Sequence, residues 1–269
     1  MLKIGHNANT NMLPLFHFLP SNPNWEWVMA EPAGHNALLA NGQIDMAPIS
    51  LFSYGEHWEQ YRIFSNLSVS ARGKVGSILL FSKRPLSELD GKLVALTTNS
   101  ATSVNLTKII LQEFYGQAPM YQTMSAELPA MLASAEAGLL IGDQAIRAAK
   151  AKPDCFIYDL GQEWLRHTGY AMTYSVWAFS KSLLLSQAAE VAEIYRLLLA
   201  AKEQSRYNLD QIIKECLELV GGTGDFWREY FSNFSYGLDG QLIAGIEYYF
   251  DCCTRLNLLP SRPQLNFWP

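Results

Sequence analysis

Neutral polar side chains cluster where the first predicted strand, residues 2–5, passes into the first predicted helix, residues 11–19. Asn7, Asn9 and Asn11 occupy this junction, and a proline in the first helical turn favours a helix start there. Asparagine amides both donate and accept hydrogen bonds, and they carry no charge. The junction therefore suits the binding and orientation of a polar organic molecule.

Three further strand-to-helix junctions are rich in small polar residues, and their one charged residue is an aspartate. In open α/β sheets, ligands bind beyond the carboxyl ends of the strands, where helices begin. Together the junctions predict a cleft lined by amides, hydroxyls and helix N-termini, which suits a small anionic organic molecule. The candidate residues are Ser50, then Ser100, Thr102 and Ser103, and finally Gly142 and Asp143.

The segment TTNSATS, residues 97–103, is the most informative of these junctions. Its hydroxyls and first-turn N–H groups would form an anion site, because helix N-termini favour a carboxylate or a phosphate. Ser100 is also explained as the N-cap of the following helix, which is the more common role and is compatible with the first. Gly142 either lets a ligand approach the backbone closely or simply forms a turn.

Groups for covalent or acid–base chemistry are scarce in the sequence. Ser77 begins an apolar strand, and no G-x-S-x-G elbow or His/Asp pattern marks it as a nucleophile. Of the five histidines, His6 lies beside the asparagine cluster and is the best candidate general base by position. Because no clear acid–base pair is visible, composition alone favours a binding protein over an enzyme.

Composition and charge exclude several classes of protein. Hydrophobic residues make up 49% of the 269 and charged residues 17%, which is typical of a folded globular chain. A net charge of −5 without a Lys/Arg run does not support nucleic-acid binding. No apolar stretch approaches the ~20 residues of a membrane span. The N-terminus shows no signal-peptide pattern, so a cytoplasmic protein is expected.

The four cysteines form no CxxC pair and have no histidine at metal-ligand spacing, so reduced structural thiols and no metal site are expected. Aromatic residues are frequent in the C-terminal helices. We interpret them as a core between helices rather than a dimer surface, and both a monomer and a homodimer stay open.

Strands alternate with helices as far as residue 180, and helices alone follow, which predicts an α/β fold with mostly parallel sheets. Two lobes are expected, and the first and last parts of the chain share one of them. Lobe 1 comprises residues 1–92 and 180–269, including the C-terminal helices, and lobe 2 comprises residues 93–179. The expected crossings are the strand-like segments 74–82 and 172–180.

Six stretches of the sequence, taken together, form a longer pattern than any single motif. They are NMLPLF (11–16), LLANGQIDMAPISLFSYGEH (38–57), LSVSARGKVGSILLFS (67–82), LDGKLVALTTNSATSVNLTKIILQEFYG (89–116), LLIGDQAI (139–146) and YDLGQEWLRHTGYAMTYSVWAFS (158–180). In this order they resemble the chorismate dehydratases of the futalosine route to menaquinone, the MqnA family. Each stretch alone is weak evidence for this family, whereas the six stretches in this order are specific to it.

The resemblance implies a fold like the type II periplasmic solute-binding proteins, with the substrate in the cleft between two lobes. It implies removal of water from chorismate to give 3-[(1-carboxyvinyl)oxy]benzoate, with neither a metal nor an organic cofactor. By motif position, Asn11 falls on the family's active-site asparagine in N-x-L-P-L, and Ser77 on the active-site serine of V-x-S. The cleft-lining segments contain Ser50, Ser100, Thr102, Gly142 and Asp143.

One departure from the family pattern lies just before Asn11. The family usually has an aromatic and an aliphatic residue where this chain has Asn9 and Thr10, so the loop is more polar. Asn9 joins the candidate substrate-binding residues. The departure bears on substrate preference and leaves Asn11 in place.

The implied reaction removes the C4 hydroxyl and the C3 hydrogen of chorismate and aromatises its ring. No strong protein base occupies the matched positions. We therefore expect the substrate's own enolpyruvyl carboxylate to take the C3 proton, with Asn11 and Ser77 positioning the groups and His6 as the rival base. The competing hypotheses are a solute-binding protein for a small carboxylate and a ligand-sensing regulatory domain.

Overall fold

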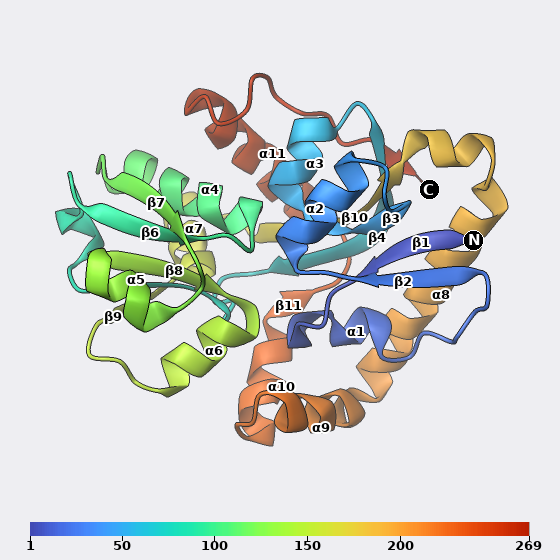
Figure 1. Ribbon diagram of the computed structural model, residues 1–269, viewed down its shortest axis with the longest axis horizontal. Coiled ribbons are helices and arrows are strands. Elements are labelled where there is room, and N and C mark those ends of the chain that lie inside the picture. The colour runs from blue at the N-terminus through green and yellow to red at the C-terminus, as the bar shows by residue number, and fades with distance from the viewer. Residues whose placement is uncertain (269) are drawn as a thin grey trace. The chain divides into compact units, whose positions relative to one another are not determined.

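The computed structural model describes residues 1–268 (Figure 1). The chain divides into two compact units, each with its own sheet and its own core. Unit 1 comprises Met1–Ser70, Thr173–Gly240 and the segment from Pro263 onward, and unit 2 comprises Ala71–Met172 and Gln241–Arg262.

Unit 1 is built on a seven-stranded sheet in the order β11-β4-β10-β3-β1-β2, with β12 paired to β4. Strands β1 and β2 run parallel, as do β1 and β3, and β10 runs antiparallel to β3. The strands are β1 Leu2–His6, β2 Trp25–Met29, β3 Met46–Ser50, β4 Tyr61–Ala71, β10 Met172–Ser180, β11 Phe234–Ser235 and β12 Phe267–Trp268.

Helices cover both faces of this sheet. The helices of unit 1 are α1 Leu13–Phe16, α2 Pro32–Ala40, α3 Leu51–His57, α8 Ala188–Tyr207, α9 Leu209–Leu219 and α10 Gly224–Ser232. Figure 1 shows α2 and α3 on one side of the strands and α1 and α8 on the other. Phe16 of α1 and Leu198 of α8 pack with Ile4, Phe64 and Trp177 of the sheet in one buried cluster. Burial of this apolar face holds the helices on the sheet.

Unit 2 is built on a five-stranded sheet in the order β7-β6-β8-β5-β9. Strands β5 and β8 are buried at every position, as expected of central strands that are covered on both faces. The strands are β5 Ile78–Ser82, β6 Leu93–Thr97, β7 Met120–Met124, β8 Ala137–Ile141 and β9 Phe156–Asp159. The helices are α4 Ala101–Ile109, α5 Leu128–Ser134, α6 Gly142–Lys150, α7 Leu160–Thr168 and α11 Gly240–Arg255.

Both sheets are mixed, and the parallel pairing expected from the sequence holds for β1–β2, β1–β3, β4–β12, β6–β7 and β6–β8. Strand β5 runs antiparallel to both β8 and β9, and β10 runs antiparallel to β3. Strand direction depends on how the chain enters each sheet, and side-chain patterns within a strand carry no information about it.

The observed units also differ from the lobes expected from the sequence, 1–92 with 180–269 and 93–179. Strand β5 pairs inside the second sheet and β10 inside the first, so the observed boundaries fall at residues 70–71 and 172–173. Helix α11 belongs with unit 2, where the Tyr249 hydroxyl donates to the Thr102 carbonyl at 3.3 Å. Contacts between distant segments decide these assignments, and the local sequence does not contain them.

Candidate functional site

Two of the three asparagines at the end of β1 shape the loop itself. The N–H of Asn9 donates to Asn7 Oδ1 at 2.8 Å, which closes a turn, and the N–H of Met12 donates to the Asn9 carbonyl at 2.9 Å. The second bond opens the 3-10 turn Thr10–Met12 that leads into α1. Part of the asparagine cluster is therefore explained by local turn formation.

Asn11 differs from its two neighbours. Its backbone carbonyl accepts a hydrogen bond from the Tyr236 hydroxyl at 2.8 Å, whereas its side-chain Oδ1 is buried and has no hydrogen-bond partner among the described residues. Burial holds the pKa of Tyr236 well above its usual value, so the phenol stays protonated as a donor. An unpaired buried acceptor costs about 1–3 kcal/mol, which a hydrogen-bond donor on a bound molecule would offset.

His6, the rival base, lies in an apolar setting at the end of β1. Its ring centroid is 4.2 Å from that of Phe16 and 5.7 Å from that of Trp27, and its Nδ1 is buried with no hydrogen-bond partner in the described chain. Burial lowers the pKa of His6, and Glu215 opposes this effect. The ring is therefore neutral at neutral pH and able to accept a proton.

Ser50 is the last residue of β3, whose carboxyl end lies beside that of the parallel strand β1. Its N–H donates to Asn36 Oδ1 at 2.9 Å, and Asn36 Nδ2 donates to Ser50 Oγ at 3.1 Å. The two bonds fix the start of α3 and orient the Ser50 hydroxyl. Unit 1 thus brings Asn9, Asn11 and Ser50 to the same edge of its sheet.

The predicted residues of unit 2 also meet at one edge of a sheet. Ser77 immediately precedes β5 and is buried, and its carbonyl accepts from the N–H of Gly142 at 2.7 Å. Gly142 has a φ of 59°, a conformation that favours glycine, and Asp143 follows it in the first turn of α6. The segment with Ser100, Thr102 and Ser103 follows β6, which runs parallel to β8. The junction rule therefore holds within this unit.

The N-cap interpretation of Ser100 is confirmed. Its Oγ accepts from the N–H of Ser103 at 3.2 Å and donates to Ser103 Oγ at 3.0 Å. Both side chains are buried, as is that of Thr102, whose carbonyl accepts from Tyr249. The hydroxyls are thus fixed by the helix start, and an anion-binding role of this segment stays a prediction.

Asp159 was missed by the sequence analysis, although it fixes the loop that carries Ser77. Its carboxylate accepts from Val75 N–H at 3.0 Å and from Gly76 N–H at 2.6 Å. It also caps α7 by accepting from the N–H groups of Gly161 and Gln162. Burial raises the pKa of Asp159, and the four N–H donors oppose that effect. An aspartate at the end of a strand can indicate a helix cap from local sequence, but the contacted loop lies more than 80 residues away and leaves no local signal.

Two absences concern the described part of the chain. Within residues 1–268, no three His, Cys, Asp or Glu side chains are grouped so that they could hold a metal ion. No helix in the same range has both the length and the apolar character that crossing a bilayer requires.

Comparisons with known sequences give a matching family and a similar protein. A family model described as menaquinone biosynthesis matches residues 2–255. A chorismate dehydratase of Thermus thermophilus is 30% identical over an alignment of 251 residues that covers 88% of this chain and 89% of that protein.

Solved structures show the fold. A protein of Archaeoglobus fulgidus superposes with a TM-score of 0.78 at 18% identity, over 96% of this chain and 98% of that one. The alkanesulfonate-binding protein SsuA of Xanthomonas axonopodis, bound to MOPS, gives 0.70 at 17% identity, over 99% and 97%. The periplasmic aliphatic sulphonate binding protein SsuA of Escherichia coli gives 0.68 at 14% identity, over 100% and 92%. The expected periplasmic-binding-protein-like fold is confirmed.

Proposed function

Because the chain belongs to the menaquinone biosynthesis family, we propose that it is a chorismate dehydratase, a carbon–oxygen lyase that converts chorismate to 3-[(1-carboxyvinyl)oxy]benzoate. The observation that carries the proposal is the 30% identity to a chorismate dehydratase over nearly the full length of both chains. The buried, unpaired amide oxygen of Asn11 supports it, since chorismate brings a ring hydroxyl that can donate to this oxygen.

The reaction breaks the C3–H and C4–O bonds of chorismate. The electron pair of the C3–H bond becomes the third double bond of the ring, and the C4 oxygen leaves and takes up a proton as water. Aromatisation makes the reaction strongly downhill, so the protein has mainly to orient the substrate and place charge. Neutral amides and hydroxyls are suited to this task.

We assign the orienting roles to Asn11 and Ser77. In this proposal Asn11 Oδ1 accepts from the C4 hydroxyl, and Ser77 positions the reacting groups. The helix start at Ser100, Thr102 and Ser103 binds a carboxylate of the substrate, because first-turn amides and the helix dipole favour an anion. Asn9, Ser50, Gly142 and Asp143 contribute further binding contacts.

The substrate's own enolpyruvyl carboxylate takes the C3 proton in this proposal. The apolar surroundings of the His6 ring support it, because burial beside Phe16 and Trp27 disfavours the imidazolium and lowers the pKa of His6, although Glu215 acts in the opposite direction. Replacement of His6 by Gln should therefore leave most of the turnover. A collapse of kcat with substrate binding intact would identify His6 as the base instead.

The deciding experiment mixes the purified protein with chorismate, without added metal or cofactor, and follows the products by chromatography with mass detection. Loss of one water with appearance of the carboxyvinyloxy-benzoate supports the dehydratase. Unchanged chorismate together with measurable binding would identify a solute-binding protein. Neither turnover nor binding would mean that the polar loop at Asn9 and Thr10 accompanies a different substrate.

A further inference from the structure

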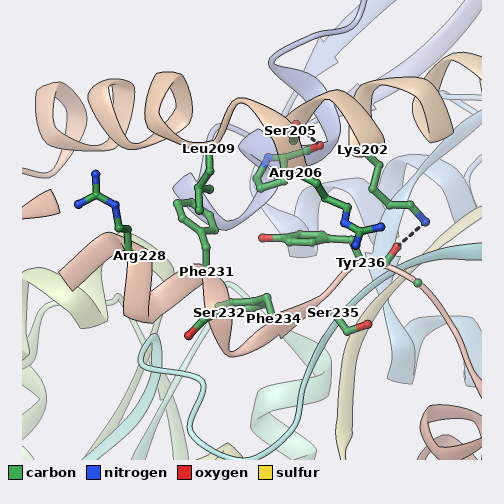
Figure 2. A pocket seen from close by; sticks show the side chains of 12 residues that line it. Lys202, Ser205, Arg206, Leu209, Arg228, Phe231, Ser232, Phe234, Ser235 and Tyr236 are labelled. Carbon is green, nitrogen blue, oxygen red and sulfur yellow. Dashed lines mark hydrogen bonds between the residues drawn. The ribbon is translucent and has the colours of Figure 1, made fainter. Parts of the chain in front are cut away.

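A cavity of about 450 Å³ lies within unit 1 (Figure 2). Its walls come from the second half of α8, from α10 and from residues 234–237, and Pro14 of α1 closes it. Among the described residues, its lining includes none of those assigned above to chorismate. Its volume lies within the range of small-molecule sites in proteins, roughly 300–1,000 Å³.

The lining of the cavity is positively charged. It contains Lys202, Arg206 and Arg228, and none of the described residues that line it has a carboxylate side chain. The two arginines form ion pairs only with side chains outside the lining, and such exposed pairs contribute little. The exposed partners are Glu203 at 3.2 Å, Asp225 at 3.3 Å and Asp210 at 2.9 Å. A ligand carboxylate can therefore compete for the guanidinium groups.

Lys202 reinforces this positive character from a more buried position. Its Nζ donates to the carbonyls of Asn66 at 2.7 Å and Tyr236 at 3.4 Å, which leaves one of its three hydrogens for a further acceptor. Burial lowers the pKa of Lys202, and a nearby anion would favour its charged form.

The rest of the wall is largely apolar and aromatic. Leu209, Phe231, Phe234 and the ring of Tyr236 line it. Figure 2 shows the Phe231 and Tyr236 rings beneath α8, from which Lys202 and Arg206 extend. A matching ligand needs a flat apolar body and one acidic group, because aromatic rings pack against aromatic walls and guanidinium binds carboxylate through paired N–H groups.

The cavity is also linked to the segment that carries Asn11. The hydroxyl of Tyr236, a lining residue, donates to the Asn11 carbonyl, and the hydroxyl of Ser205, another lining residue, donates to the Pro14 carbonyl at 2.8 Å. A molecule in the cavity would thus contact the side chains that hold the Asn11 segment.

We propose that this cavity is a second ligand site, specific for a small aromatic carboxylate and separate from the residues assigned to chorismate. The proposal concerns binding alone, so it stands whether or not the protein turns over chorismate. The carboxylate lies toward Arg206 and Lys202, which Figure 2 shows at the same end of the cavity, and the ring lies against Phe231 and Tyr236.

The test is a fluorescence titration of the full chain with 1-naphthoate and with 1-naphthamide, its uncharged counterpart. The proteins are the wild type, Arg206→Gln, and Arg166→Gln as the matched control. Arg206 and Arg166 are both exposed and both pair with a glutamate three residues earlier, but only Arg206 lines the cavity. Leu209→Trp, which fills the apolar part, is the second cavity variant.

We expect the wild type and Arg166→Gln to bind naphthoate equally, and Arg206→Gln to bind it about tenfold more weakly, as loss of a charge-assisted pair predicts. Leu209→Trp should block binding, and naphthamide should bind at least tenfold more weakly than naphthoate. Equal affinity for the amide, or equal effects of the two arginine variants, would overturn the proposal. The proposal would also be overturned if chorismate displaced naphthoate and Arg206→Gln bound naphthoate with wild-type affinity. Naphthoate would then occupy the chorismate site.

Discussion

At the residue scale, Asn11 combines two different environments. Its backbone carbonyl is held by Tyr236, whereas its side-chain oxygen is buried without a partner in the described chain. Desolvation of an unpaired acceptor lowers the free energy of unfolding. In the proposed function, the hydroxyl of the bound substrate pairs with this oxygen and removes that cost.

Asn11→Ala should separate stability from activity. Since the substitution removes an unsatisfied acceptor, we expect the free energy of unfolding to stay within about 1 kcal/mol of wild type or to rise. The kcat for chorismate should fall about 100-fold or more, as for other preorganised amide groups. Chemical denaturation and turnover assays measure the two effects.

The matched control is Asn7→Ala, which removes the acceptor of the Asn9 N–H. It should lower the free energy of unfolding by about 1 kcal/mol. A larger loss of stability in Asn11→Ala than in Asn7→Ala would show that Asn11 has a structural role instead.

His35 makes the stability of the fold depend on pH. The ring is fully buried, and burial lowers the pKa of His35 below 6.5 despite a hydrogen bond to the Val28 carbonyl at 3.2 Å. The unfolded chain takes up a proton near pH 6.5 while the folded chain does not, so stability is lost as the pH falls below 6.5. His6, nearby and also with a lowered pKa, acts in the same direction.

In His35→Gln, which keeps a side-chain donor but cannot titrate, the free energy of unfolding should fall less between pH 7 and pH 5 than in wild type. Urea denaturation at the two pH values measures this difference. An unchanged difference would show that His35 does not contribute to the pH dependence.

At the element scale, Asp159 joins two elements that are distant in sequence. One carboxylate caps α7 and holds the N–H groups of Val75 and Gly76, immediately before Ser77. An asparagine amide has a single acceptor oxygen, so Asp159→Asn keeps the cap or the loop bonds but not both. We infer that Asp159 positions Ser77 for the reaction.

A double-mutant cycle tests this role. Asp159→Asn should reduce kcat about tenfold, Ser77→Ala about 100-fold, and the double variant no more than Ser77→Ala alone, because Asp159 acts through Ser77. Glu163→Gln, a buried carboxylate on the same helix that accepts from Tyr115 at 2.6 Å, should leave kcat unchanged. If the double variant lowered kcat by the product of the two single reductions, Asp159 would not act through Ser77.

At the scale of the whole molecule, helix α11 belongs to unit 2, although nearly 70 residues of unit 1 separate it in sequence from Met172, where the first segment of unit 2 ends. Tyr249 packs against Trp164, and Arg255 forms two hydrogen bonds with Glu113 at 3.1 and 2.7 Å. Leu242, Ile246 and Phe250 are buried as well. The interpretation of the C-terminal aromatic residues as core is confirmed for Trp227, Tyr230, Phe231, Tyr249 and Phe250.

Unit 2 should therefore need α11 to fold. A fragment of residues 71–172 joined by a flexible linker to residues 241–262 should unfold cooperatively, whereas residues 71–172 alone should be less stable by roughly 3 kcal/mol or more. Circular dichroism during denaturation measures the difference. Gly245→Ala in the joined fragment is the control, since its Cβ would lie 2.2 Å from the Ala171 carbonyl oxygen and weaken the docking of α11. Equal stability with and without α11 would contradict this dependence.

Local patterns in the sequence were sufficient to predict the helices and strands, the family and some local contacts. The alternation of strands and helices and the N-cap at Ser100 depend on residues within a few positions of one another. The six ordered stretches were sufficient for the family. The positions of Asn11, Ser77 and Gly142 at strand ends follow from the same short-range patterns.

Only the tertiary structure decided the contacts between distant segments. The reversed directions of β5 and β10, the place of α11 in unit 2, and the bonds of Asp159 to the Ser77 loop and of Tyr236 to Asn11 join residues up to 225 positions apart. Such contacts form where packing and burial bring segments together, and neither side-chain periodicity nor capping patterns encode them. For the same physical reason, the cavity beside Tyr236 could not be found in the sequence.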